Sequence, residues 1–355
     1  MNSTPRILLI RRDNIGDLLC TTPLLHAIRQ RYPQAYLAVL ASSYNVAVLN
    51  GNPDIDDVFV YLKRQQRSHE HGLLSMLWKR WALIRMLRTR RFDHVLLANG
   101  GWRYARQLGG KSIIGFRERD NPDHRQPDIV VPLANRGRDD HEVAKMALLG
   151  SAIGVEQAVG PLHIFPDAAL VTTAGVRLRE LGWHPEQSTL AVHISSRQPG
   201  QRWPEAFFVE FIRRLNEHDK RQILLFWAPG LEDDPMHPGD DGKAARILAQ
   251  LANLPVFPCP TRSIEVLTAT LSLAGQMVCS DGGAMHIAAA LGKPIVCFFG
   301  HSNCVEWHPW HVPYVLLQAD SKRVQDISVE DALAAVREAS AMSSAPIRKK
   351  KICSM

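Results

Sequence analysis

A short glycine-rich segment in the second half of the chain has the residue types needed to bind a phosphate group. The apolar run 276–279 ends at Ser280-Asp281-Gly282-Gly283, and the pattern predicts a helix over 284–291 and a second strand over 295–299. Paired glycines let the backbone approach a ligand closely, and the free N–H groups of a helix start favour an anion. Asp281 and His286 could then contact a ribose or a phosphate. An ordinary strand–turn–helix connection has the same pattern, so this segment alone does not establish a site.

A carboxylate near the N-terminus strengthens the case. Residues 6–11 predict a strand, 12–16 a turn and 17–31 a helix. Asp17 therefore lies at the carboxyl edge of the first strand, where open α/β sheets bind ligands. Asp13 is in the same loop, either as a second functional carboxylate or as a cap of the turn or helix start.

Two longer motifs contain these residues. One is R-x-D-x-I-G-D-x-x-x-x-T-P, from Arg11 to Pro23, and the other is S-D-G-G-x-M-H-I-A-A-A-L-G-K-P, from Ser280 to Pro294. Together with Asn52-Pro53, Arg202-Trp203-Pro204 and the segment 299–309, they resemble glycosyltransferase family 9, the heptosyltransferases of lipopolysaccharide core assembly. The resemblance spans roughly residues 6 to 310.

The resemblance implies an α/β chain with the GT-B fold, in which two Rossmann-like, doubly wound parallel-sheet domains face each other across a cleft. It also implies an inverting glycosyltransferase that moves heptose from ADP-heptose onto a lipopolysaccharide core or a related glycan acceptor. Such an enzyme needs a nucleotide-sugar donor and an acceptor, and we expect no cofactor and no essential metal.

An inverting transfer needs a base that removes the proton of the acceptor hydroxyl. The resemblance assigns this role to Asp17, whose alternative role is a stabilising acid at a helix N-terminus. Asp13 is the nearest rival for the base.

The resemblance also assigns contacts to the phosphates of the donor. Ser195 and Ser196 match small hydroxyl residues that follow a strand. Gln201 stands where many relatives carry Lys, so a positive charge is missing there, and Arg197 or Arg202 could replace it.

Other donor contacts are expected on three further loops. Glu232 matches an acid that accepts from the ribose hydroxyls, although a solvated loop acid would fit its surroundings equally well. Gly282 and Gly283 form the phosphate turn, and relatives often carry Thr at position 282. His286 either donates to a phosphate or packs in the core.

The segment from Lys63 to Arg91 is strongly basic, with nine Lys and Arg residues against one acid, Glu70. A helix within 71–89 places Leu73, Leu74, Leu77, Trp78, Trp81 and Ile84 on one face. Lys79, Arg80 and Arg85, together with Asp13 of the first loop, are candidates for acceptor binding. Such a helix suits an anionic membrane surface or a phosphorylated lipid acceptor, and a helix packed on the core with a solvated basic back is the plainer alternative.

Composition fits a globular protein that does not bind nucleic acid. The net charge is +7, but no nucleic-acid-binding module is recognisable. The six cysteines show no CxxC pair, which indicates buried thiols of a reducing compartment. No signal peptide and no apolar run of ~20 residues is recognisable, so we expect a cytoplasmic protein, possibly peripheral on the cytoplasmic face of the inner membrane. Asp54-Ile55-Asp56 and the run from His301 to His311 fit no metal template.

Alternating strands and helices predict a parallel sheet in each half. We expect an N-terminal acceptor domain over 1–165, a C-terminal donor domain over 166–327, a helix over 328–341 with a capping box at Ser328, and a basic, disordered tail over 342–355. Two other functions remain open. One is a nucleotide-sugar epimerase of the same fold, and the other is a degenerate protein that binds a sugar nucleotide or lipid-linked glycan.

Overall fold

The structure is a computed structural model of the 355-residue chain. It describes residues 4–61, 73–117, 126–133, 140–156, 158–234, 239–342 and 349–352. The chain divides into two compact units, Met1–Phe165 and Pro166–Met355.

Unit 1 is built on a six-stranded parallel sheet with the order β3-β2-β1-β4-β5-β6. Its strands are nearly continuous apolar runs, as expected of a parallel sheet buried on both faces. The strands are β1 (Arg6–Ile10), β2 (Tyr36–Ser42), β3 (Asp57–Tyr61), β4 (His94–Leu97), β5 (Ser112–Phe116) and β6 (Ile129–Val131).

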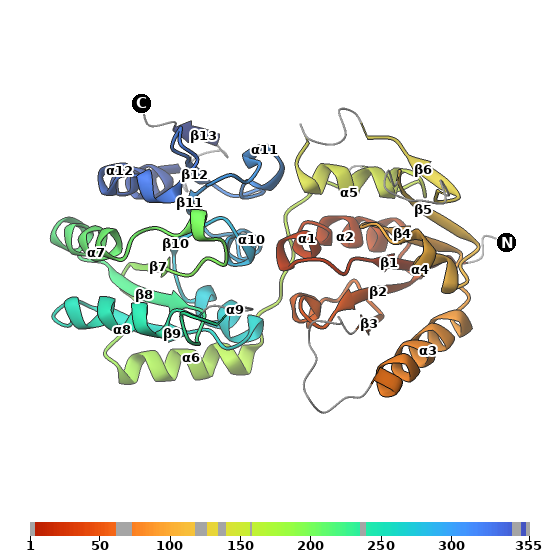
Figure 1. Cartoon of the computed structure of the whole chain (residues 1–355), viewed down its shortest axis with the longest axis horizontal. Helices are drawn as coiled ribbons and strands as arrows, with labels where there is room; N and C mark the ends of the chain where they lie inside the picture. Colours follow the sequence, from red (N-terminus) through yellow and green to blue (C-terminus); the bar gives the residue numbers. More distant parts are fainter. Residues whose placement is uncertain are drawn as a thin grey trace. The chain divides into compact units, whose positions relative to one another are not determined.

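Helices cover both faces of this sheet (Figure 1). Leu8 and Ile10 of β1 pack with Leu87 of α3 and Ala105 of α4 in one core cluster. Alternate residues of a strand point to opposite faces, so Ile7 and Leu9 face the other side. Helices α2 and α5 pack against each other. The helices of unit 1 are α1 (Ile15–Leu19), α2 (Thr22–Arg31), the 3-10 helix η1 (Val46–Leu49), α3 (Leu73–Thr89), α4 (Trp102–Gln107) and α5 (Glu142–Ser151).

Unit 2 repeats this architecture with a seven-stranded parallel sheet in the order β13-β12-β11-β10-β7-β8-β9. Its strands are β7 (Thr189–His193), β8 (Gln222–Trp227), β9 (Val256–Pro260), β10 (Gln276–Ser280), β11 (Ile295–Phe298), β12 (Tyr314–Leu317) and β13 (Lys349–Ile352). Its helices are α6 (Ala168–Glu180), η3 (Pro199–Gln201), α7 (Glu205–Asp219), α8 (Asp241–Gln250), α9 (Ile264–Ser272), α10 (Gly283–Ala290), α11 (Cys304–Trp307), η4 (Val324–Asp326) and α12 (Val329–Met342). Figure 1 shows α7, α8 and α12 along one side of this sheet and α9 and α10 along the other. Both units are thus doubly wound and Rossmann-like, and the predicted GT-B fold class is confirmed in these terms.

Several elements differ from the sequence-based expectation. The predicted helix 17–31 is two helices, α1 and α2, because Pro23 has no N–H group and suits the first turn of a new helix. Helices α4 and α6 and strands β5, β6, β9 and β12 were not anticipated.

The C-terminal tail also differs from expectation. Part of it, Lys349–Ile352, forms β13, where we expected disorder. It pairs with β12, whose outer edge otherwise presents unpaired N–H and C=O groups. The capping box before α12 does form, since the backbone N–H of Asp331 donates to the hydroxyl of Ser328, 3.1 Å away.

Trp203 lies at the centre of the unit 2 core. Its side chain is 1% exposed, and its ring contacts Phe207, Phe208, Phe211 and Phe298. The indole N–H donates to the carbonyl oxygen of Ile327 at 2.9 Å, so the one polar atom of the side chain is satisfied.

We expect Trp203→Ala to lower the free energy of unfolding of unit 2 by ~3–5 kcal/mol, because it leaves a large cavity among aromatic rings. Thermal unfolding followed by near-UV circular dichroism measures this change. Trp203→Phe should cost less, since it keeps a ring and loses the hydrogen bond to Ile327. Leu231→Ala, at a position that is 75% exposed, is the control and should change little. A Trp203→Ala variant as stable as the wild type would contradict this account of the core.

Candidate functional site

In both sheets the predicted site residues follow the central strands. The strand order reverses between β1 and β4 in unit 1 and between β7 and β10 in unit 2. Ligands of open α/β sheets bind outside the carboxyl ends of the strands at such switch points. Asp13 and Asp17 follow β1, the loop 195–202 follows β7, and Asp281 follows β10. The topology therefore brings the two motifs of the sequence to equivalent places in the two units.

In unit 1 a buried guanidinium organises the carboxylates. Arg11 is 2% exposed. Its Nη2 lies 2.7 Å from Oδ1 of Asp17, its Nε 2.9 Å from Oδ1 of Asp13, and its Nη1 2.8 Å from Oε1 of Glu142 on α5. Lys145 pairs with the other oxygen of Glu142 at 3.2 Å. Arg11 thus fixes the positions of both predicted carboxylates.

The charges in this cluster shift two pKa values. The pKa of Asp13 is raised to about 6. Burial is the largest cause and the negative charge of Asp17 adds to it, while the positive charge of Arg11 acts in the opposite direction. Burial alone would lower the pKa of Arg11, but the carboxylates of Glu142, Asp13 and Asp17 outweigh burial and raise it. Arg11 is therefore charged at any physiological pH, and Asp13 gains or loses a proton close to neutrality.

A second arginine, which the sequence analysis did not single out, lies next to this cluster. The guanidinium of Arg12 lies against the rings of both Tyr61 and Tyr104, 4.8 and 4.6 Å from their centroids, and the two rings contact each other edge to face with their centroids 5.3 Å apart. Arg80 of α3 lies 5.0 Å from the Tyr61 centroid. Burial lowers the pKa of Arg12, and the tyrosines and Asp13 act against that shift. The pair Arg11-Arg12 at the end of an apolar strand was the signal that could have identified it.

The predicted acceptor residues of α3 do not gather in one place. Arg80 joins Arg12 and Tyr61, whereas Lys79 and Arg85 are exposed, and Arg85 lies over the ring of Trp81 at 5.5 Å. Only Arg80 of these three lies beside the carboxylate cluster of unit 1. The expected shared apolar face of α3 is also wrong in part, because Ile84 packs on the core while Trp78 and Trp81 are exposed.

In unit 2, Gln201 connects the loops that follow three neighbouring strands. Its Nε2 donates to Oδ2 of Asp281 at 3.1 Å and to the hydroxyl of Ser302 at 2.7 Å. The hydroxyl of Ser280 donates to its backbone carbonyl at 2.7 Å, and the hydroxyl of Ser196 donates to its Oε1 at 3.3 Å. The residue that departs from the family pattern therefore has a definite structural role.

The other predicted donor residues of the loop after β7 have different surroundings. The hydroxyl of Ser195 accepts from the backbone N–H of Ala228 at 2.9 Å. The Nε of Arg202 donates to the carbonyl of Ser196 at 3.0 Å, which leaves the rest of its guanidinium for other partners. Arg197 is exposed.

Three further predicted donor residues lie after β8 and β10. Glu232 is about half-exposed and pairs with Arg246 at 3.0 Å. Gly282 precedes Gly283, the first residue of α10, and a Cβ at Gly282 would meet no heavy atom within 4 Å. His286 is 3% exposed, with its ring 6.0 Å from that of Trp307, so its burial favours the packing role.

Lys243 of α8 is a buried cation beneath the loop after β7. Its Nζ donates to the carbonyl of Ile194 at 2.9 Å and to the carbonyl of Trp203 at 3.4 Å, one residue before and one residue after the loop 195–202. Burial lowers its pKa. Sequence reasoning missed Lys243 because it lies far along the chain in an ordinary helix pattern.

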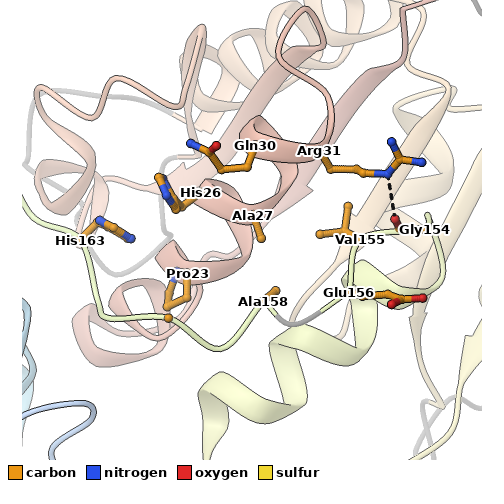
Figure 2. A pocket seen from close by; sticks show the side chains of 11 residues that line it. Pro23, His26, Ala27, Gln30, Arg31, Gly154, Val155, Glu156, Ala158 and His163 are labelled. Atoms are coloured by element: carbon orange, nitrogen blue, oxygen red, sulfur yellow. Dashed lines mark hydrogen bonds between the residues drawn. The ribbon is translucent and has the colours of Figure 1, made fainter.

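Unit 1 also contains a cavity of about 700 Å³ that none of the predicted site residues lines. Figure 2 shows it between α2 and residues 154–156 and 158–163, with the rings of His26 and His163 near each other and Arg31 hydrogen-bonded to the carbonyl of Gly154. Its walls are one helix and a loop, not the carboxyl ends of strands, so we do not assign the reaction to it.

Asp54 and Asp56 have structural partners, as expected of a loop. Asp54 accepts from His26 at 3.0 Å, and Asp56 accepts from Arg29 at 2.8 Å and from the backbone of Leu37 at 2.7 Å. Over the described ranges, no three His, Cys, Asp or Glu side chains are grouped so as to hold a metal ion. The helices searched in those same ranges include none long and apolar enough to cross a membrane.

The raised pKa of Asp13 gives a testable effect on stability. The folded state holds this proton more tightly than an unfolded chain with the ordinary value of 3.8, so the stabilisation is full below about pH 4 and is lost as pH rises through about 6. At pH 7 and above, Asp13→Asn removes a partly buried charge, and we expect a gain of ~1–3 kcal/mol in the free energy of unfolding. Melting temperatures measured from acidic to neutral pH should converge at low pH. Glu186→Gln, a change at an exposed acid, is the control. If Asp13→Asn instead lowers the free energy of unfolding at neutral pH, the ion pair of Asp13 with Arg11 stabilises the fold by more than the burial of the charge destabilises it.

Comparisons with known proteins agree with this arrangement. The profile of glycosyltransferase family 9 (heptosyltransferase) matches residues 80–336. The chain is 23% identical to lipopolysaccharide heptosyltransferase 3 of Escherichia coli over 307 residues, which is 83% of each chain.

Solved structures share the fold. A family 9 glycosyltransferase from Veillonella parvula has a TM-score of 0.79 at 18% identity, covering 94% of this chain and 97% of that one. E. coli heptosyltransferase WaaC with ADP has a TM-score of 0.73 at 17% identity, covering 94% and 99%. At these identities the structures establish only the fold, whereas the profile covers most of the chain and establishes the family. The chain belongs to glycosyltransferase family 9, the heptosyltransferase family, and is a glycosyltransferase.

Proposed function

We propose that this glycosyltransferase transfers heptose from ADP-heptose, with inversion, to a lipopolysaccharide core or a related glycan at the cytoplasmic face of the inner membrane. The family supplies the reaction class, and relatives named as lipopolysaccharide heptosyltransferases support the sugar and the acceptor. A solved relative described with ADP supports the nucleotide. The observation that carries the proposal is the Arg11 cluster, which holds two carboxylates at the switch point of unit 1.

In the proposed reaction, Asp17 takes the proton from the acceptor hydroxyl while that oxygen forms a bond to C1 of the sugar. The bond between C1 and the oxygen of ADP breaks at the same time, and ADP leaves with the electron pair. Nη2 of Arg11 lies 2.7 Å from Oδ1 of Asp17. This ion pair orients the carboxylate of the base before the acceptor binds.

The donor would occupy the loops after β7, β8 and β10. Negative charge grows on the leaving diphosphate, and the N-terminal N–H groups of α10, Arg202 and Arg197 are proposed to bind it. Glu232 would accept from the ribose hydroxyls. Arg12 and Arg80 both lie over the ring of Tyr61 in unit 1, and we propose that they bind an anionic group of the acceptor.

Asp13 is a second candidate for the base because its pKa of about 6 suits a base that works near neutrality. The two carboxylates share Arg11, so the proton taken up near pH 6 belongs to the pair rather than to one residue. Variants must therefore separate their roles.

We expect Asp17→Asn to lower kcat by about 10²–10⁴-fold while donor binding changes little. In the wild type, kcat/KM should fall as pH drops below about 6. Asp13→Asn should keep activity and move that fall to lower pH, because Asp17 then has Arg11 without a second carboxylate beside it. Rates of ADP release with a defined acceptor, measured across pH, test both statements. If Asp13→Asn loses activity and Asp17→Asn keeps it, Asp13 is the base. If neither variant changes turnover, neither carboxylate is the base.

The donor nucleotide is tested by thermal shift with ADP, UDP, GDP and CMP, because a ligand that binds only the folded state raises the melting temperature. A rise in melting temperature with ADP alone supports the proposal. A rise with another nucleotide alone overturns the assignment of ADP-heptose as the donor. Consumption of ADP-heptose without any acceptor would favour the epimerase alternative.

Gln201 provides a sharper test of the donor site. We expect Gln201→Lys to tighten ADP binding by about three- to tenfold, because an ammonium beside Asp281 adds a charge-assisted contact to the diphosphate. Gln201→Met, of similar length but uncharged, is the matched control and should not tighten binding. The gain should shrink as salt rises. If Gln201→Lys binds ADP with unchanged or weaker affinity, the diphosphate does not bind beside this loop.

A further inference from the structure

Helix α3 has one face on the core and another face in solvent. Leu87 is fully buried, and Leu83 and Ile84 pack against the cluster that includes Phe92 and Trp102. On the helical wheel, Trp78, Trp81 and Arg85 follow one another at spacings of three and four residues on the side away from Leu87. The side of α3 opposite the core is therefore a stripe that contains two tryptophans.

The exposure of these tryptophans is unusual. Trp78 is 66% exposed and Trp81 is 55% exposed, and Met86, at 43%, is the next exposed large apolar residue along the helix. Tryptophan carries a large apolar ring with one polar N–H group. Two exposed rings on one stripe therefore favour a partner with a polar surface layer above an apolar interior.

The charge around the stripe is positive. Lys79, Arg85 and Arg88 are exposed, and the guanidinium of Arg85 lies over the Trp81 ring. The sequence from Leu73 to Arg91 contains no Asp or Glu. A surface with this composition attracts an anionic partner, and it would repel a second copy of the same stripe.

We propose that the stripe of Trp78, Trp81 and Arg85, flanked by Lys79 and Arg88, docks the protein on a bilayer that contains anionic lipid. The indole rings enter the interface between headgroups and acyl chains, and the cations contact lipid phosphates. This inference names the docking surface and does not depend on the proposed transfer reaction, because lipid binding requires neither donor nor acceptor.

The test is co-sedimentation of the full-length protein with vesicles of phosphatidylcholine alone or of phosphatidylcholine mixed with phosphatidylglycerol. We expect the wild type to bind the mixed vesicles at least tenfold more tightly than the neutral ones, with weaker binding as salt rises above about 0.1 M. Trp78→Ser/Trp81→Ser should reduce binding to mixed vesicles at least tenfold. Arg85→Gln/Arg88→Gln should reduce it and remove much of its salt dependence.

The matched control is Leu231→Ser/Val305→Ser, which removes two exposed apolar side chains of unit 2, at 75% and 46% exposure. It should bind vesicles as the wild type does, and the melting temperatures of all variants should match because the changed residues lie in solvent.

Three results would overturn the proposal. The first is no binding to anionic vesicles, and the second is binding that the double tryptophan variant retains in full. The third is a wild-type dimer in sedimentation velocity that Trp78→Ser/Trp81→Ser converts to a monomer, which would assign the stripe to a second copy. Since no substrate is present, a failure here leaves the transfer reaction untouched, and a failure of the Asp17 tests leaves vesicle binding untouched.

Discussion

The guanidinium of Arg11 is the interaction on which the candidate site of unit 1 depends. A charge that is 2% exposed is tolerated only with close partners, and Arg11 has three carboxylates within 2.9 Å. Removing it would leave buried negative charges that repel one another. The same contacts tie the loop after β1 to α5, so the position of Asp17 is set by a residue from much later in the chain. Burial in this cluster also raises the pKa of Asp13 to about 6.

Both units use the same sheet order but place different residue types at its switch point. In each, the reversal of strand order opens a place beside the first strand, and loops from neighbouring strands converge there. Unit 1 supplies carboxylates and arginines at this place. Unit 2 supplies hydroxyls, glycine N–H groups and an amide, which suit a diphosphate. The division of residue types matches a reaction in which one substrate needs a base and the other needs its leaving group stabilised.

Much of the fold could be predicted from the sequence because parallel strands are long apolar runs and helices begin and end at recognisable residues. Asp17 and Ser280–Gly283 were predicted as site residues because each lies at the first turn and helix start after such a run. Glu142 and Lys243 were not, since their roles depend on contacts between residues far apart in sequence. The apolar face of α3 was predicted only partly correctly, for a related reason. Helical periodicity predicts that apolar residues share a side, but only packing decides that Leu87 lies inside while Trp78 lies outside.

The contacts of Lys243 have a consequence for ligand affinity. Because one ammonium holds the carbonyls of Ile194 and Trp203, the residues between them form a loop whose two ends are fixed to a single point on α8. A loop anchored in this way loses few conformations when a ligand binds. The conformational entropy of the loop is therefore lost mainly during folding and not during binding. An anion that enters would meet groups already in place, and its affinity would depend mainly on charge and hydrogen bonding.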